Sequence, residues 1–283
     1  MRALPFTKWS PSGNTTLLFP AESVTGAQQA ATASQALMPH LLGGEQAGFC
    51  HLRERRLRMA GGEFCVNATR AFGALLALEE ERTARQAGTP HHEEVREHAF
   101  EVQVSGWQGP VGVRVRGSLP EWRVAADLEL PACPMQQPAP GVTLVRLPGI
   151  AHLLLDERHV FPEDFLAASA LLRREYELAA LPASGVVWWR QVQHQLEMFP
   201  VVHVRDAGTT CLENACGSGA LALGLRLCPA GARRVFTILQ PGGEPLEVTV
   251  DRQGGAVRAT VDGPVRLVAE GRLWLPEGAT DRA

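Results

Sequence analysis

Short stretches in which apolar and polar residues alternate make up most of this chain, and turns containing glycine or proline separate them. Alternation with a period of two is typical of half-buried strands. In the first half the pattern predicts strands at 15–20, 45–53, 56–62, 99–106 and 111–119. In the second half it predicts strands at 142–148, 151–157, 185–192 and 200–206, and a hairpin over 235–251. We therefore expect a protein built mainly from antiparallel strands.

Four other segments predict helices. Two lie at 21–38 and 162–181, and two begin at a cysteine, Cys65 in the first half and Cys216 in the second. Residues 220–227 are apolar on nearly every face, so the helix after the second cysteine must be surrounded by other structure. Because most of the remaining chain is predicted to form strands, we expect strands to surround this helix.

The two halves repeat one order of elements: a strand, a helix, further strands, a helix opened by a cysteine, and a hairpin. This repetition predicts a duplicated α+β unit, joined by a proline-rich linker over 130–141. We expect two pseudo-symmetric lobes, each a curved and mainly antiparallel sheet wrapped around a central helix. Residues 1–128 form the predicted lobe with Cys65, and residues 129–267 form the predicted lobe with Cys216. Both helix starts are expected to face the cleft between the lobes.

Composition narrows the range of functions. The chain has 283 residues, of which 45% are hydrophobic and 20% charged, and its formal net charge is −3, as in ordinary globular proteins without a nucleic-acid partner. No apolar run approaches the ~20 residues of a membrane span, and the first residues lack the apolar core of a signal peptide. We expect a cytoplasmic protein without a membrane partner, whose six cysteines are thiols.

Two local patterns are interpreted as surface features. The basic cluster at 52–59 predicts a solvated strand or turn, because arginine is used throughout the chain. His91, His92 and His98 lie near acidic residues, but their spacing is not that of a metal site, so no metal is expected.

The positions of the two cysteines suggest acid/base chemistry. Unpaired N–H groups and the dipole at a helix N-terminus favour negative charge, which lowers the pKa of a thiol and also attracts a carboxylate. If Cys65 and Cys216 face one small molecule from opposite sides, one can take a proton and the other can deliver one, which inverts a stereocentre. Lys8 is the only lysine and is a poor candidate to hold pyridoxal phosphate, so no cofactor is expected.

Two alternatives follow from the same residues. A cysteine at a helix start is more often a packed small hydrophobic residue than a catalyst, although its recurrence in matched halves favours chemistry. A hydrolase with one nucleophilic cysteine would need a base, for which His152 and His203 are candidates, and no local motif supports that arrangement.

Five motifs together carry a resemblance to a known family. They are FTKWSPSGNTTLLF at 6–19, GEFCVNATRAF at 62–72, ENACGSG at 213–219, QPGG at 240–243 and VDGPVRLVAEG at 261–271. With them the chain resembles, over essentially its whole length, the diaminopimelate epimerase superfamily of cofactor-independent racemases, and within it the histidine racemases of nicotianamine-like metallophore biosynthesis. The resemblance implies the two-lobed fold, with the last strand, about 268–283, crossing back to complete the first lobe. It also implies racemisation at Cα by Cys65 and Cys216.

The same resemblance implies which residues bind an amino acid. Asn14 and Asn67, with backbone around Val66, Gly217 and Ser218, would hold the α-carboxylate and the amino group, and Glu213 would bind the α-ammonium. Each has an ordinary alternative: Asn14 can simply form a turn, Asn67 can cap a helix, and Glu213 can be a solvent-facing acid.

The sequence departs from the family pattern at two places. Val66 stands where the family has glycine, and Ile150 stands where diaminopimelate epimerases have an asparagine that binds the far end of their substrate. The partners of a second charged end are therefore missing, and a shorter or less charged side chain is expected. Glu45 and His152 are the proposed lining of the side-chain pocket. Trp188 and Trp189 are further candidates, for which packing in the core is the favoured interpretation.

These observations lead to one functional hypothesis. We predict an amino-acid racemase that acts on histidine or a similar polar amino acid and supplies a D-amino acid for an opine-type metallophore. The alternatives are diaminopimelate epimerase and a catalytically silent amino-acid-binding protein on the same fold. The expected partner is a small-molecule amino acid, and a homodimer is a candidate assembly.

Overall fold

Strands joined edge to edge form most of the molecule in the computed structural model, which describes residues 1–88, 97–130 and 135–276. Within those ranges sixteen strands make one continuous sheet, and four α-helices accompany it. The predicted mixture of α and β structure is confirmed. No helix in the same ranges is long and apolar enough to cross a membrane. His91 and His92 lie outside the described residues.

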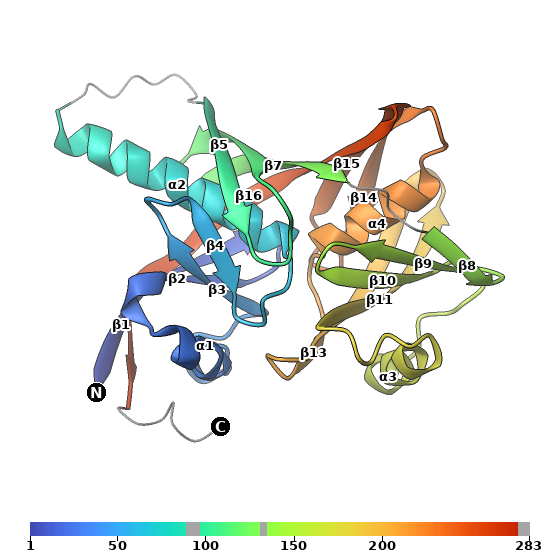
Figure 1. The fold of residues 1–283 in the computed structure, drawn as a ribbon, viewed down its shortest axis with the longest axis horizontal. Coiled ribbons are helices and arrows are strands. Elements are labelled where there is room, and N and C mark those ends of the chain that lie inside the picture. Colours follow the sequence, from blue (N-terminus) through green and yellow to red (C-terminus); the bar gives the residue numbers. More distant parts are fainter. Residues whose placement is uncertain (89–96, 131–134, 277–283) are drawn as a thin grey trace.

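The first seven strands and the last one close into a barrel around helix α2 (Figure 1). Helix α2 (Val66–Gln86) contacts all eight of these strands, and every residue from 66 to 78 is buried. The polar end of the helix, after residue 78, projects from the barrel. The strands are β1 (Arg2–Pro11), β2 (Thr16–Pro20), β3 (Gln46–His51), β4 (Arg56–Met59), β5 (Glu97–Val104), β6 (Val111–Ser118), β7 (Glu121–Leu130) and β16 (Ala256–Leu275).

A second group of strands packs around helix α4 (Gly217–Leu227), as the apolar sequence of that helix predicts (Figure 1). Helix α3 (Phe165–Glu175) contacts β11 and β12 and covers a separate apolar cluster. The strands of this group are β8 (Met135–Ala139), β9 (Val142–Leu147), β10 (Ile150–Leu155), β11 (Ala183–Val192), β12 (Gln195–Val204), β13 (Thr209–Leu212), β14 (Arg233–Leu239) and β15 (Pro245–Gly254).

Strand β16 takes part in both groups. Its residues 256–262 pair with β15, residues 257–266 with β7, and residues 265–275 with β1. The strand therefore enters the barrel well before residue 268, where the sequence argument placed its return. The neighbouring strand β7 continues to Leu130, past the predicted division between residues 128 and 129.

Two of the predicted helices are shorter than expected. The segment 21–38 contains two 3₁₀ turns and then α1 (Gln29–Ala36). The interruption falls at Val24, which is extended and buried in the core, so tertiary packing overrides local helix propensity. The segment 162–181 forms α3 only from Phe165 onwards, after Asp164 accepts a hydrogen bond from Ala167 N as its N-cap.

The expected linker at 130–141 is only partly a linker. Its last residues form β8, which pairs with β9 at the outer edge of the second group. A proline inside a strand is tolerated at such an edge, because no further strand needs its missing N–H. Pro138 occupies this position, and the abundance of proline therefore misled the sequence interpretation.

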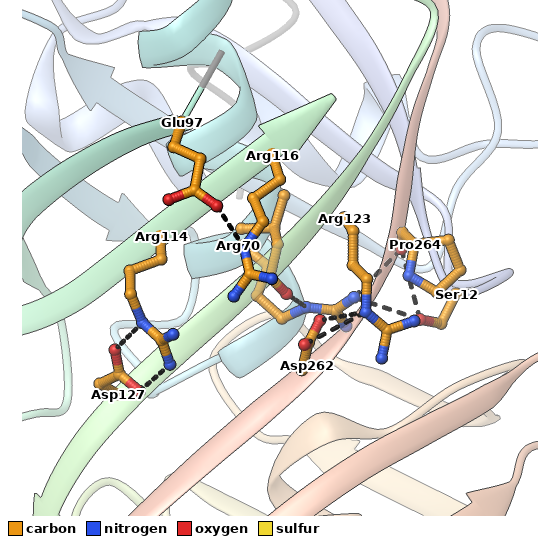
Figure 2. A network of polar contacts seen from close by, with 10 residues as sticks. Ser12, Arg70, Glu97, Arg114, Arg116, Arg123, Asp127, Asp262 and Pro264 are labelled. Carbon is orange, nitrogen blue, oxygen red and sulfur yellow. Dashed lines mark hydrogen bonds and ion pairs between the residues drawn. The ribbon is translucent and has the colours of Figure 1, made fainter. Parts of the chain in front are cut away.

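A buried arginine fixes α2 inside the barrel (Figure 2). The Arg70 side chain has no exposed surface. Its guanidinium donates to the carbonyl oxygens of Val124 on β7 (2.9 Å) and Pro264 on β16 (3.1 Å), and to Ser12 Oγ (3.3 Å). Burial lowers the pKa of Arg70 to about 10, so it stays charged near neutrality. Arg70 thus ties the Cys65 helix to the turn that follows β1.

Candidate active site

The two cysteines occupy equivalent places at the starts of α2 and α4. Each is the N-cap residue of its helix: Cys65 Sγ accepts a hydrogen bond from Ala68 N, and Cys216 Sγ accepts one from Gly219 N, both at 3.4 Å. The predicted position of both thiols at helix N-termini is therefore observed. Sulfur here takes the capping role usually filled by the side-chain oxygen of Ser, Thr, Asp or Asn.

The two helix starts lie against each other. A Cβ added to Gly217 would lie 2.8 Å from Val66 Cβ and 3.0 Å from Asn67 Oδ1, closer than packed atoms normally approach. Glycine at the first position of α4 therefore permits this close contact. Val66, the departure from the family pattern, packs directly against that glycine. Cys65 and Cys216 line one and the same cavity.

Two glycine-containing turns support this junction from one side. Gly13 has a left-handed φ of 92°, and a Cβ built on it would lie 3.5 Å from Gly242 Cα. The turns at 11–14 and 240–243 are therefore in contact. Gln240 Oε1 accepts a hydrogen bond from Cys216 N at 3.0 Å. Gly242 N donates to Asn214 O at 2.8 Å. The QPGG motif therefore holds the backbone on which the second cysteine is carried.

A chain of hydrogen bonds reaches the first thiol. Asn14 Nδ2 donates to Glu45 Oε2 (2.9 Å), and Gln46 Nε2 donates to both Asn14 Oδ1 and Thr16 Oγ1 (2.7 Å each). The amide nitrogen of Gln46 is used in this way, so its oxygen faces the cysteine. Cys65 Sγ lies 2.9 Å from that oxygen and donates to it. The network thus holds Cys65 in its protonated form.

The second thiol has a different partner. Cys216 Sγ lies 3.6 Å from Ser218 Oγ, and either atom can be the donor. Ser218 Oγ is also 2.9 Å from His152 Nε2. The Ser218 hydroxyl can donate to a Cys216 thiolate, whereas the Gln46 amide oxygen can only accept from the Cys65 thiol. The two cysteines are therefore alike in backbone position and unlike in proton chemistry.

The cavity is acidic. Glu45, Glu63 and Glu213 line it, and no Lys, Arg or His is found among the described residues of its wall. Burial, and then the charge of Glu45, raises the pKa of Glu213 to about 8. Burial also raises the pKa of Glu63 to about 7 and that of Glu45 in the same direction. Such a cavity favours a ligand that carries positive charge or hydrogen-bond donors.

Burial also outweighs the effect of the helix N-termini on the thiols. It is the main cause that raises the pKa of Cys65 and of Cys216, and the charge of Glu213 adds to it. The net direction of both pKa shifts is therefore upward, opposite to the expectation from the helix N-termini. A ligand that brings positive charge would lower both pKa values.

The structure brings most of the predicted site residues together. Apart from Asn14 and His152, all of them line the cavity, and Ile150 does so too. Asn14 is buried beside the site and bonds to Glu45, Gln46 and Ala215 O. His152 is fully buried behind its hydrogen bond to Ser218, and burial lowers its pKa to about 3. Trp188 belongs to the apolar cluster covered by α3, in agreement with the favoured interpretation that it packs in the core.

Three polar residues of the site were not predicted as such. Gln46, Glu63 and Gln240 lie in the sequence beside predicted residues or inside a quoted motif, yet no local pattern distinguishes them. Gln46 is held beside Thr16 by the pairing of β3 with β2 and contacts Cys65 from another element of the fold. Such contacts between distant elements cannot be predicted from the sequence without the fold.

Known proteins were then compared with the chain. Residues 3–274 match the sequence profile of the family described as histidine racemase CntK N-terminal domain. A histidine racemase from Fusobacterium nucleatum subsp. nucleatum (strain ATCC 25586) is 26% identical over 279 residues, which cover 97% of this chain and 98% of that protein. A histidine racemase from Staphylococcus aureus (strain Mu50) is 21% identical over 290 residues, with the same coverage.

Solved structures resemble the fold. A hydroxyproline epimerase from Agrobacterium vitis with bound trans-4-hydroxy-L-proline superposes with a TM-score of 0.62 at 10% identity, covering 99% of this chain and 95% of the other. A predicted epimerase from Pseudomonas aeruginosa gives a TM-score of 0.61 at 15% identity, covering 96% and 100%. At these identities the likeness concerns the fold alone.

Proposed function

The chain belongs to the histidine racemase CntK family, and from this membership we propose that it is an isomerase that inverts the Cα of histidine without a cofactor. The observation that carries the proposal is the pair of cysteines at the abutting starts of α2 and α4, both lining one cavity. Chemistry through a Schiff base would need a lysine, and the only lysine, Lys8, donates to Leu42 O instead.

The helix starts supply the binding site for the α-carboxylate. The first N–H groups of a helix have no partner within it, and here the two helices present such groups side by side, from Val66 and Asn67 and from Gly217 and Ser218. Together they can hold an anion and stabilise the charge that builds on the carboxylate when the α-proton leaves. Glu213 lines the same cavity and binds the α-ammonium in this proposal.

The two thiols then act on opposite faces of Cα. For one enantiomer the Cys216 thiolate takes the α-proton, and the Cys65 thiol gives its proton to the other face. For the opposite enantiomer the roles are exchanged. The positive charge of the bound ammonium favours formation of the thiolate in either case. When the thiol that took the α-proton has released a proton to solvent and the other has taken one up, the protein is back in its starting state.

The architecture assigned to this reaction is also part of the proposal. We propose two pseudo-symmetric lobes, residues 1–128 with the last strand and residues 129–267, each contributing one thiol. Their support is the separate enclosure of α2 and α4. The resemblance to metallophore-pathway racemases supports a D-histidine product destined for an opine-type metallophore. A cytoplasmic location and a homodimer remain predictions from sequence.

The test is loss of the Cα proton signal of L-histidine in deuterium oxide, followed by nuclear magnetic resonance, with chiral chromatography to detect D-histidine. The wild-type protein should give both. Cys65→Ser and Cys216→Ser should each abolish net inversion, because a serine hydroxyl is far too weak an acid to form the required anion. Near wild-type inversion in either variant would overturn the two-thiol mechanism. Binding of L-histidine without any exchange would instead identify a silent binding protein.

A further inference from the structure

Glu63 lies at the cavity wall two residues before the first cysteine. Its backbone is held in place, because Ser105 Oγ donates to Glu63 O at 2.9 Å and accepts from Met59 N at 2.9 Å. The Glu63 side chain is only 8% exposed. Its Oε2 atom is buried and has no hydrogen-bond partner among the described residues. A buried carboxylate oxygen without a donor is costly, which indicates a missing partner.

The other two acids of the cavity are already occupied. Glu45 accepts hydrogen bonds from Asn14 Nδ2 and from both Asn214 N and Nδ2. Glu213 is assigned to the α-ammonium in the proposed function. The Glu63 carboxylate receives only the backbone N–H groups of Gly61 and of Glu63 itself. Of these three acids, Glu63 therefore has the free capacity to bind a donor on a ligand.

The position of this carboxylate can be stated from its neighbours. A Cβ built on Gly61 would lie 2.7 Å from Glu63 Oε2 and 2.5 Å from Val204 Cγ1, so the carboxylate sits beside Val204. Val204, Val202, Ala60 and Ala207 all line the cavity. Thr209 and Cys211, which pair with Val204 and Val202, also line it, and Glu63 is the acid of this part of the wall. A flat ring with one N–H donor matches such a surface, because the ring packs on the apolar atoms while the N–H meets the carboxylate.

We propose that Glu63 determines specificity by accepting a hydrogen bond from the side-chain N–H of the substrate, the imidazole of histidine. This inference rests on the proposed function, since it names the group that selects the side chain. It differs from the sequence hypothesis, in which Glu45 and His152 lined the pocket. A substrate without the N–H leaves the Glu63 oxygen unpaired and is rejected for that reason.

The first experiment compares substrates in the wild-type protein and in Glu63→Gln. Each is assayed by Cα deuterium exchange with L-histidine and with 3-(2-thienyl)-L-alanine, whose ring is of similar size and has no N–H. A charge-assisted hydrogen bond is worth roughly 10- to 100-fold. Glu63→Gln should lower kcat/KM for histidine by about that factor, mainly through KM, and change the value for thienylalanine by less than ~3-fold. Glu54→Gln, in the exposed turn before β4, is the matched control and should change neither.

A second variant tests the position without altering the acid. Gly61→Ala places a methyl group against Glu63 Oε2 and Val204 Cγ1, so it should reduce the preference for histidine over thienylalanine in the same way. Circular dichroism and thermal unfolding establish that each variant is folded. Equal losses on both substrates, or an unchanged preference for histidine, would overturn the role of Glu63. If the wild-type protein exchanges other amino acids and not histidine, the proposed function fails, which is a separate result.

Discussion

The junction between the two helix starts gives the sharpest prediction about how the site is built. Gly217→Ala places a methyl group 2.8 Å from Val66 Cβ and Cγ1 and 3.0 Å from Asn67 Oδ1, where atoms of a packed core have no room. Overpacking of this kind costs typically 1–3 kcal/mol, and alanine recovers up to ~1 kcal/mol in a helix. We expect a net loss of about 1–2 kcal/mol in the free energy of unfolding, measured with urea.

The same clash predicts coupling between the two positions. Val66→Gly removes the two closest atoms that Gly217→Ala would meet, at the cost of a buried side chain, about 3 kcal/mol with the glycine penalty included. In the double variant only the 3.0 Å contact with Asn67 Oδ1 remains, so the combined loss should be smaller than the sum by about 1 kcal/mol. Gly26→Ala is the control, because a Cβ there meets no atom within 4 Å, and it should change the unfolding free energy by less than ~0.5 kcal/mol.

Activity should follow the same pattern. Gly217→Ala pushes the two thiols apart, and a misplacement of about 1 Å can cost ~100-fold in rate. We expect kcat for histidine racemisation to fall at least ~10-fold, and Val66→Gly to restore part of it. Strictly additive unfolding energies, or full activity in Gly217→Ala, would show that the helix starts are not packed against each other as described.

Four further outcomes are expected. With a β-chloro amino acid, Cys65→Ser and Cys216→Ser should still eliminate chloride from opposite enantiomers, because elimination needs only one base; the same preference in both variants would contradict the assignment of faces. Gln46→Met removes the acceptor of the Cys65 thiol, so the pH midpoint of Cys65 alkylation by iodoacetamide should fall by up to about one unit while that of Cys216 stays unchanged. Diaminopimelate should not be turned over, since Ile150 lines the cavity; efficient turnover would disprove this interpretation. Burial raises the pKa of Glu213 to about 8, so the folded protein holds this proton more tightly than the unfolded chain does. The free energy of unfolding should therefore fall as pH rises from 5 to 8. A Glu213→Gln variant with the same pH dependence would exclude Glu213 as the cause.

The parts of the site that could be predicted from sequence are those fixed by local structure. Cys65 and Cys216 each precede a run of residues that is apolar on most helical faces, and that pattern determines both the helix and its burial. The glycine after Cys216 indicates a close approach of backbones, although not which residue approaches. Local patterns therefore located the two thiols and the motif residues next to them.

The parts that could not be predicted depend on which strands become neighbours. Gln46 on β3 contacts Cys65 at the start of α2, and Glu63 lies beside Val204, which is far away in the sequence. The pKa values of the thiols likewise follow from burial and from acids on other elements, which no helix pattern reports. Composition also gave a wrong prediction where the position in the sheet decides: the proline-rich segment predicted as a linker contains the edge strand β8.

The unlike surroundings of the two thiols have a kinetic consequence. Racemisation of a free amino acid has an equilibrium constant of one, so kcat/KM must be equal in the two directions whatever the enzyme does. Cys65 donates to an amide oxygen that can only accept, whereas Cys216 lies 3.6 Å from the Ser218 hydroxyl, which can donate to a thiolate. If the proposed two-thiol mechanism holds, this difference favours the direction in which Cys216 acts as the base. Any advantage of that direction must consequently appear as kcat and KM raised or lowered together by the same factor. Measuring kcat and KM separately for L- and D-histidine thus tests whether the two thiols differ in proton transfer. The ratio kcat/KM must be equal for the two enantiomers, so it checks only the accuracy of the measurement.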